Sequence, residues 1–77
     1  MAYIPPPREL PGFPKARRTD PKSQRQRWVD DEGHIFEWDY QHGAVEMYDP
    51  RGRHLGEFDY KTARQRKEPD PTRRIDT

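Results

Sequence analysis

The chain contains no cysteine among its 77 residues. No disulfide can therefore stabilise the fold, and no thiolate is available as a nucleophile or zinc ligand. Hydrophobic residues are scarce at 29%, whereas 38% of the residues are charged and the mean hydropathy is −1.50. No apolar run approaches the roughly 18 residues of a membrane-spanning helix, and the opening Met1–Pro7 lacks the basic start and apolar stretch of a signal peptide. The sequence predicts at most one small domain with a limited core.

The charges that are present occur in blocks. Residues 1–28 contain seven Lys or Arg against two acids, residues 29–59 contain two against nine, and residues 60–77 contain six against three. Basic ends suit a polyanion such as nucleic acid. An acidic centre repels a polyanion, so it suits a nucleic-acid ligand only if the carboxylates have a chemical role in a reaction of that ligand.

Proline divides the chain into an arm and a folded part. Eight of the nine prolines lie at positions 5–21 or at 69 and 71. Because proline donates no N–H and resists both helix and central strand, residues 1–22 are predicted to form an extended Pro-rich arm. The arm is expected to lie over the domain through Leu10, Phe13 and Pro14. Residues 23–77 are predicted to form the functional domain.

Turn signals recur every 8–10 residues within that domain, at Asp31–Gly33, Gln41–Gly43 and Asp49–Gly52. They bracket four predicted strands, at about Arg25–Val29, His34–Tyr40, Ala44–Tyr48 and His54–Phe58. No segment shows a helical period. The sequence therefore predicts a small all-β fold, an antiparallel meander.

Alternation along the strands predicts two different faces. The expected core residues are Trp28, Phe36 and Trp38. If Trp38 lies opposite Val45, then Glu37 faces Glu46 and Asp39 becomes a diagonal neighbour of Glu46. Like charges that face each other destabilise a sheet, so a cation is expected to offset the two glutamates.

An acid, an imidazole and a second acid occur close together at Asp39, His42 and Glu46. These groups can move a proton off one oxygen and onto another, although singly each fits an ordinary turn or surface role. His34 and His54 are isolated in the sequence and are predicted to be structural or solvated. No H-E-x-x-H, C-x-x-C or EF-hand spacing occurs, so neither a metal site nor a cofactor is predicted.

Cleavage of RNA by transesterification would use such groups. The reaction needs a base for the 2′-hydroxyl, an acid for the leaving 5′-oxygen and a cation for the phosphorane. Glu46 or His42 could act as base or acid, and Arg73 or Arg74 could supply the cation. Because the attacking hydroxyl belongs to the substrate, neither metal nor cysteine is required.

A series of short motifs extends from about Arg25 to Ile75. They are Arg27-Trp28, Glu37-Trp38-Asp39, Gln41-His42-Gly43, Val45-x-x-Tyr48, His54-Leu55-Gly56, Phe58-Asp59, Lys61-Thr62 and Pro69-Asp70-Pro71-x-Arg73. In this order and spacing they resemble the cytotoxic ribonuclease domain of the ribosome-inactivating E-type colicins. The resemblance implies a highly twisted antiparallel sheet and metal-independent cleavage of 16S rRNA in the ribosomal decoding centre. Cleavage would leave a 2′,3′-cyclic phosphate and stop translation.

The resemblance also assigns roles to residues. The family's catalytic positions fall on Asp39, His42, Glu46 and Arg73. Glu46 would be the general base, His42 the acid or phosphate stabiliser, Asp39 the group that orients His42, and Arg73 the holder of the scissile phosphate. Candidate RNA contacts are Arg25, Arg27, Tyr48, Lys61 and Arg74. Tyr48 either stacks on a base or packs across the strands.

The chain departs from the family at Ala44, where those colicins have a further glutamate, and at Tyr40, where they have a serine. Neither change removes a group that the proposed chemistry needs. The resemblance further implies a larger parent protein with translocation domains that delivers this domain into the cytoplasm of a target bacterium. It also implies an acidic cognate immunity protein as a partner.

Two other functions are compatible with the composition. A non-catalytic RNA-binding or ribosome-binding module would keep the basic ends without needing Glu46. A protein-interaction domain would use its acidic centre to dock a basic partner.

Overall fold

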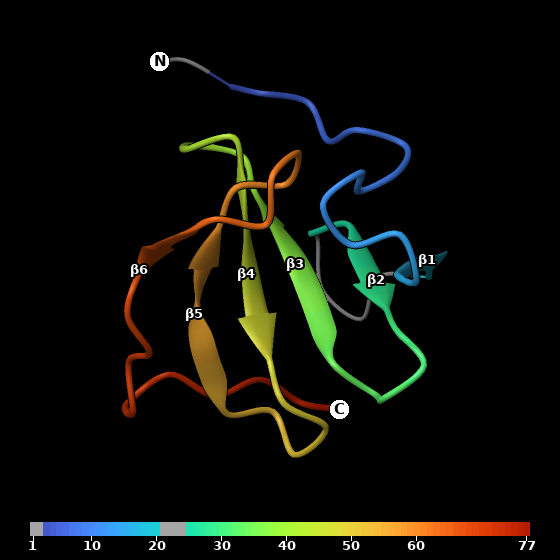
Figure 1. Ribbon diagram of the computed structural model, residues 1–77. Helices are drawn as coiled ribbons and strands as arrows, with labels where there is room; N and C mark the ends of the chain where they lie inside the picture. Colours follow the sequence, from blue (N-terminus) through green and yellow to red (C-terminus); the bar gives the residue numbers. More distant parts are fainter. Residues whose placement is uncertain (1–2, 21–24) are drawn as a thin grey trace.

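The computed structural model describes residues 3–20 and 25–77. Six strands form one antiparallel sheet in the order β1-β2-β3-β4-β5-β6 (Figure 1). They are β1 Arg17–Thr19, β2 Arg27–Val29, β3 Ile35–Asp39, β4 Ala44–Tyr48, β5 His54–Phe58 and β6 Gln65–Lys67. Each strand pairs with its neighbours in sequence, so the predicted all-β meander is confirmed. The described residues form no helix that is long and apolar enough to span a membrane.

The two edge strands were not predicted. β1 has the sequence RRT and β6 has the sequence QRK, and both are largely exposed. Short charged edge strands carry no apolar alternation, because they bury almost no side chains, so periodicity cannot detect them. β1 lies within the stretch predicted as the extended arm. The predicted boundary between residues 22 and 23 falls outside the described residues.

The hairpin turns share one device, an aspartate that accepts backbone N–H groups. Asp30, Asp39, Asp49 and Asp59 each accept a hydrogen bond of 2.8–2.9 Å from the N–H two residues later. Such turns let a short polar side chain take the place of a backbone acceptor. The β3–β4 turn ends at Gly43, whose φ of +64° is a left-handed conformation that glycine adopts without strain.

The amino-terminal segment covers the apolar face of the sheet. Trp28, Phe36, Trp38 and Val45 form the core on this face, and Leu10 from the segment joins them with 2% of its surface exposed. The segment also accepts both indole N–H groups, from Trp28 at Arg8 O (3.3 Å) and from Trp38 at Ile4 O (2.8 Å). In Figure 1 it crosses beside β2 and β3. Residues 3–16 therefore complete the core of the sheet.

The carboxy-terminal segment is attached at the start of β5. His54 N–H donates to Arg73 C=O (3.3 Å), and Ile75 N–H donates to Gly52 C=O (3.0 Å). A Cβ at Gly52 would collide with the Ile75 carbonyl, so glycine is what permits this approach. Figure 1 shows the segment passing the ends of β5 and β4. Arg73 is thereby brought to the second face of the sheet.

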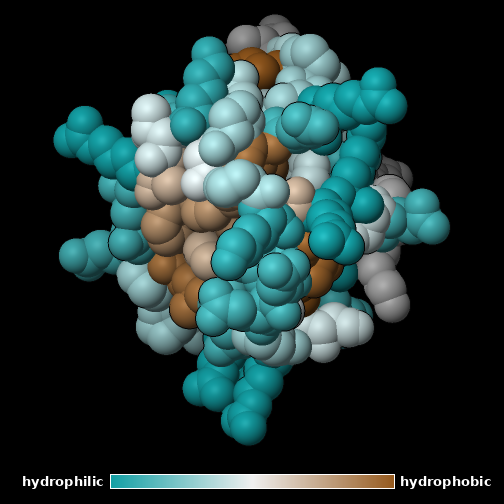
Figure 2. Space-filling view, turned by 45° about the vertical axis from the view of Figure 1, so that its right-hand side comes forward, coloured by the Kyte–Doolittle hydropathy of each residue, from teal (hydrophilic) through white to brown (hydrophobic). Residues whose placement is uncertain are grey.

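On the face seen in Figure 2, long hydrophilic side chains stand out around several hydrophobic areas. Among the described residues, the exposed large hydrophobic side chains are Tyr3 and Ile4. The hydrophobic core cluster lies on one side of the sheet, and Ile35, Ala44 and Tyr48 are buried outside that cluster.

Replacement of Leu10 by alanine should lower the free energy of unfolding by about 3 kcal/mol, because it removes a buried side chain and leaves a cavity beside Trp28. Urea unfolding followed by tryptophan fluorescence measures the change. Glu9→Ala, at an exposed neighbouring position, is the matched control and should change stability by less than about 0.5 kcal/mol. Equal effects of the two substitutions would show that the segment contributes nothing to the core.

Candidate active site

A row of charged side chains crosses five strands on the face opposite the core. By strand register, Arg27 pairs with Glu37, Glu37 with Glu46, Glu46 with Glu57, and Glu57 with Lys67. The three glutamates are only 3–4% exposed. The predicted pairing of Glu37 with Glu46 is therefore confirmed, and the expected cation is present for each of them, Arg27 beside Glu37 and Arg73 beside Glu46.

Arg27 neutralises the first glutamate. Its Nη2 lies 2.6 Å from Glu37 Oε2, and each of the two side chains is 6% exposed. Its Nη1 donates to the backbone carbonyl of Asp76 at 3.2 Å. A buried charge requires such a partner, because an unpaired one is costly to remove from water. With its guanidinium inside the protein, Arg27 is not placed for the RNA contact predicted from the sequence.

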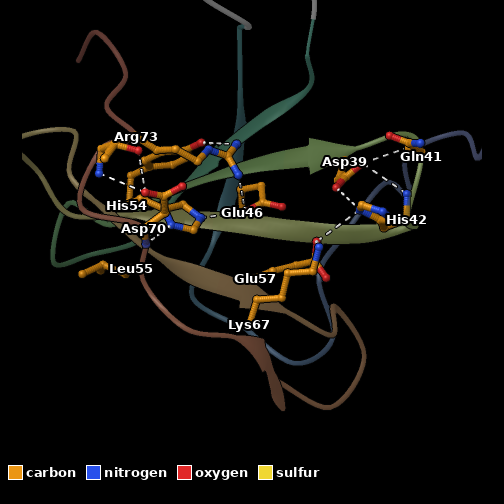
Figure 3. Close-up of polar contacts among 12 residues, drawn as sticks. Asp39, Gln41, His42, Glu46, His54, Leu55, Glu57, Lys67, Asp70 and Arg73 are labelled. Atoms are coloured by element: carbon orange, nitrogen blue, oxygen red, sulfur yellow. Dashed lines mark hydrogen bonds and ion pairs between the residues drawn. The ribbon is translucent and has the colours of Figure 1, made fainter.

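Glu46 is held by two donors. Its Oε1 accepts hydrogen bonds from His54 Nε2 (2.7 Å) and from Arg73 Nη1 (3.2 Å), as Figure 3 shows. On the other side of the His54 ring, Nδ1 accepts the N–H of Asp70 at 2.9 Å. An accepting Nδ1 carries no proton, so the proton lies on Nε2 and the ring is neutral. The carboxylate of Glu46 is thus bound by a guanidinium and a neutral imidazole.

Of the two roles predicted for His54, structural or solvated, the structure fits the structural one, and it places the residue in the site, which its isolation in the sequence did not indicate. The pairing of β4 with β5 shifts between Met47 and Tyr48, so that Tyr48 pairs with His54, while Met47 pairs with Gly56. This bulge turns His54 onto the face of Glu46, where strict alternation would have placed it on the other face. Gly56, with a φ of +136°, allows the distortion. The spacing of the sequence does not reveal a bulge.

Arg73 lies at the edge of the site with one side open. Its side chain is 39% exposed, and its Nη2 donates to the Tyr48 hydroxyl at 3.0 Å. Tyr48 is 1% exposed, and its burial raises the pKa of its hydroxyl although the Arg73 charge opposes this. Of the two alternatives for Tyr48, base stacking does not fit a buried ring. The geometry fits a packing residue that also fixes Arg73.

Asp39 orients the imidazole of His42. Its Oδ1 accepts the N–H groups of Gln41 (2.9 Å) and His42 (3.1 Å), and its Oδ2 lies 2.6 Å from His42 Nδ1. Partial burial disfavours the charged carboxylate, but these hydrogen bonds outweigh it and lower the pKa of Asp39. Because the carboxylate accepts the Nδ1 proton, Nε2 is the nitrogen left for a ligand. The His42 side chain is 46% exposed, so a ligand can reach it.

Glu57 is a member of the site that sequence reasoning missed. Its Oε1 is buried, has no hydrogen-bond partner among the described residues, and lies 3.4 Å from His42 Nδ1 and 4.0 Å from Lys67 Nζ. Burial and the adjacent Glu46 carboxylate raise the pKa of Glu57, against the opposing charges of Lys67 and His42. The sequence held no signal for this residue, because its place beside Glu46 depends on the register of β4 with β5.

The fold and the geometry of the site can now be set beside known proteins. The chain matches the family described as Cytotoxic over residues 4–76. It belongs to that family. It is 49% identical to colicin E3 of Escherichia coli over 67 residues, which cover 84% of this chain and 12% of the colicin. It is 47% identical over 66 residues to colicin E6 and to cloacin of the same organism, in each case covering 83% of this chain and 12% of the relative. The resemblance to E-type colicins that the sequence predicted is confirmed.

In this Cytotoxic domain, three of the predicted RNA contacts are exposed. Arg25 precedes β2, Lys61 lies in the β5–β6 turn, and Arg74 follows Arg73 in the carboxy-terminal segment. The Lys61 Nζ lies 5.6 Å from the centroid of the Tyr60 ring. Their roles in RNA binding stay predictions. Asp39, His42, Glu46 and Arg73, the four predicted catalytic residues, lie on one face, as Figure 3 shows.

The described residues include two groups with the side chains that metals bind. They are Asp30 with Glu32 and His34, and Asp39 with His42 and Glu57, and the ligand atoms of each group lie within 4.8 Å of one another. In the second group the 2.6 Å between Asp39 Oδ2 and His42 Nδ1 fits a hydrogen bond. This distance is shorter than the separation of about 3.3 Å between two ligand atoms of one zinc ion, given zinc's bond lengths and tetrahedral angles.

Glu57 should make the stability of the protein depend on pH. A carboxyl whose pKa is higher in the folded than in the unfolded state favours folding while it is protonated, below the unfolded value of about 4.3. This contribution is lost as the pH rises through the raised pKa of the folded state. Glu57→Gln cannot ionise, so its stability relative to wild type should increase between pH 4 and pH 8. Urea unfolding of both proteins over this range measures the difference, and a constant or shrinking difference would contradict the assignment.

Proposed function

We propose that this chain is the ribonuclease domain of a bacterial toxin, and that it cleaves 16S rRNA in the decoding centre of the ribosome. The proposal is supported most by the setting of Glu46. This buried carboxylate is bound by the guanidinium of Arg73 at 3.2 Å and stands on the same face as the exposed imidazole of His42. Membership of the Cytotoxic family and the similarity to the colicins support the toxin class.

Glu46 acts as the general base in this proposal. It removes the proton from the 2′-hydroxyl of the nucleotide before the scissile bond, and the resulting oxygen attacks the adjacent phosphorus. A base requires the ionised carboxylate, and the guanidinium of Arg73 supplies the counter-charge for it at 3.2 Å. The neutral His54 fixes the carboxylate by a single hydrogen bond without adding a competing charge.

His42 acts as the general acid. Its Nε2 proton passes to the 5′-oxygen as the bond from phosphorus to that oxygen breaks, which leaves a 2′,3′-cyclic phosphate and a 5′-hydroxyl. Asp39 accepts the Nδ1 proton and stabilises the imidazolium before the transfer. The pair thus fixes both the orientation and the protonation of the ring.

Arg73 neutralises the charge that develops on the phosphate. One edge of its guanidinium is fixed by Glu46 and Tyr48, and the rest of this 39% exposed side chain faces solvent. A planar guanidinium fixed in advance binds phosphate oxygens without reorganising during the reaction. The side chains present can perform the reaction without a metal ion.

The parent protein and the partners also belong to the proposal. The chain spans 12% of the length of the three colicin relatives. We infer a larger secreted protein whose other domains deliver this one into the cytoplasm of a target bacterium. An acidic cognate immunity protein would protect the producing cell by binding this domain.

Replacement of Glu46 by glutamine should reduce cleavage of 16S rRNA at least about 100-fold, because the amide cannot accept the hydroxyl proton. Purified ribosomes are incubated with the protein in EDTA, and the short 3′ fragment of 16S rRNA is quantified. Binding of the variant to ribosomes should persist, and Glu68→Gln, at an exposed position, should cleave as wild type does. Undiminished cleavage by the Glu46 variant would refute its role as base, and wild-type protein that binds ribosomes without cutting would favour the non-catalytic alternative.

Replacement of Arg73 by lysine should lower the cleavage rate by roughly tenfold to a hundredfold, since an ammonium cannot contact Glu46, Tyr48 and phosphate together. The single-turnover rate at saturating protein measures the effect. Arg64→Lys, an exposed change in the β5–β6 turn, is the matched control. If both variants lose the same activity, Arg73 contributes only its charge to a general attraction for RNA.

A further inference from the structure

Glu57 occupies a position between the two groups that exchange protons in the proposed reaction. It pairs with Glu46 across β4 and β5, and its Oε1 lies 3.4 Å from Nδ1 of His42. Its side chain is 4% exposed. In Figure 3 the carboxyl lies below the His42 ring, between that ring and Lys67. No step described so far uses this residue.

The neighbouring residues explain how Glu57 reaches His42. Ala44 is fully buried, and by continuation of the β4–β5 register it lies diagonally from Glu57 on the same face. Because the Ala44 side chain ends at Cβ, the longer Glu57 side chain can pass it toward the β3–β4 turn. The carboxyl that approaches His42 beside Asp39 thus comes from β5.

We propose that Glu57 is a positioning residue of the active site, which acts through His42 and keeps its imidazole protonated in the pH range where the domain cleaves RNA. The proposal rests on the proposed function, in which His42 is the general acid. Two carboxylates, Asp39 and Glu57, face the same ring nitrogen from different strands. A carboxylate at this distance favours the imidazolium over the neutral ring.

The charged groups around Glu57 determine when it exerts this effect. They are Glu46 on β4, Asp39 and His42 at the β3–β4 turn, and Lys67 on β6. Glu46 and burial oppose ionisation of Glu57, whereas His42 and Lys67 favour it. Glu57 therefore ionises at a higher pH than an ordinary glutamate, because burial and Glu46 raise its pKa. Once ionised, its carboxylate faces Nδ1 of His42 at 3.4 Å and favours the imidazolium.

The test compares wild type with Glu57→Gln and Glu57→Asp. Single-turnover cleavage of 16S rRNA is measured from pH 5 to 9, and Glu32→Gln, an exposed loss of the same charge, is the control. The alkaline limb of the rate profile should move down by about one pH unit in Glu57→Gln. Glu57→Asp keeps the charge and should lie between Glu57→Gln and wild type. Loss of activity by the same factor at every pH, without movement of the limb, would overturn the proposal and show a purely structural role.

A second measurement does not depend on ribonuclease activity. The ring ¹⁵N signals of His42, identified by their loss in His42→Asn, are followed over the same pH range without RNA. In Glu57→Gln the ring should lose its proton about one pH unit earlier than in wild type. Coincident curves overturn the role of Glu57, whatever the cleavage assay shows. Wild-type protein that cuts no rRNA, together with shifted curves, would instead refute the proposed function and leave the link between Glu57 and His42 in place.

Discussion

Three glutamates buried side by side on one face of a small sheet are the constraint on which the rest of this structure depends. Glu37, Glu46 and Glu57 pair across β3, β4 and β5, and like charges in this arrangement repel. Each is offset by a group from elsewhere in the chain. Arg27 offsets the first, Arg73 and the neutral His54 bind the second, and His42 and Lys67 stand on either side of the third.

The two ends of the chain complete opposite faces of the sheet. The amino-terminal segment adds Leu10 to the apolar core and accepts the indole N–H groups of Trp28 and Trp38. The carboxy-terminal segment adds Arg73 to the polar face, and its Asp76 carbonyl accepts a hydrogen bond from Arg27. The site is therefore assembled between the central strands and the carboxy-terminal segment.

A single register links the catalytic proposal to the fold. Asp39 begins the β3–β4 turn by accepting two backbone N–H groups, and its second oxygen holds the ring of His42. The same carboxyl thus forms the turn and orients the proposed acid. On the adjacent strand β4, the pairing of Trp38 with Val45 sets Glu46 opposite Glu37, on the same face as Asp39. Local turn chemistry and cross-strand pairing together place acid and base on one face.

The sequence by itself determined the meander and the β3–β4 register, which are local because they follow from turn residues and alternation. The family and the four candidate catalytic residues were predicted from motifs that resemble the E-type colicins. Only the tertiary structure decided the positions and partners of His54, Glu57 and Arg27. The bulge in β4–β5 turned His54 toward Glu46, the β5 register brought Glu57 beside it, and burial placed Arg27 inside. Strand distortion and burial depend on contacts between distant segments, so no local pattern of residues encodes them.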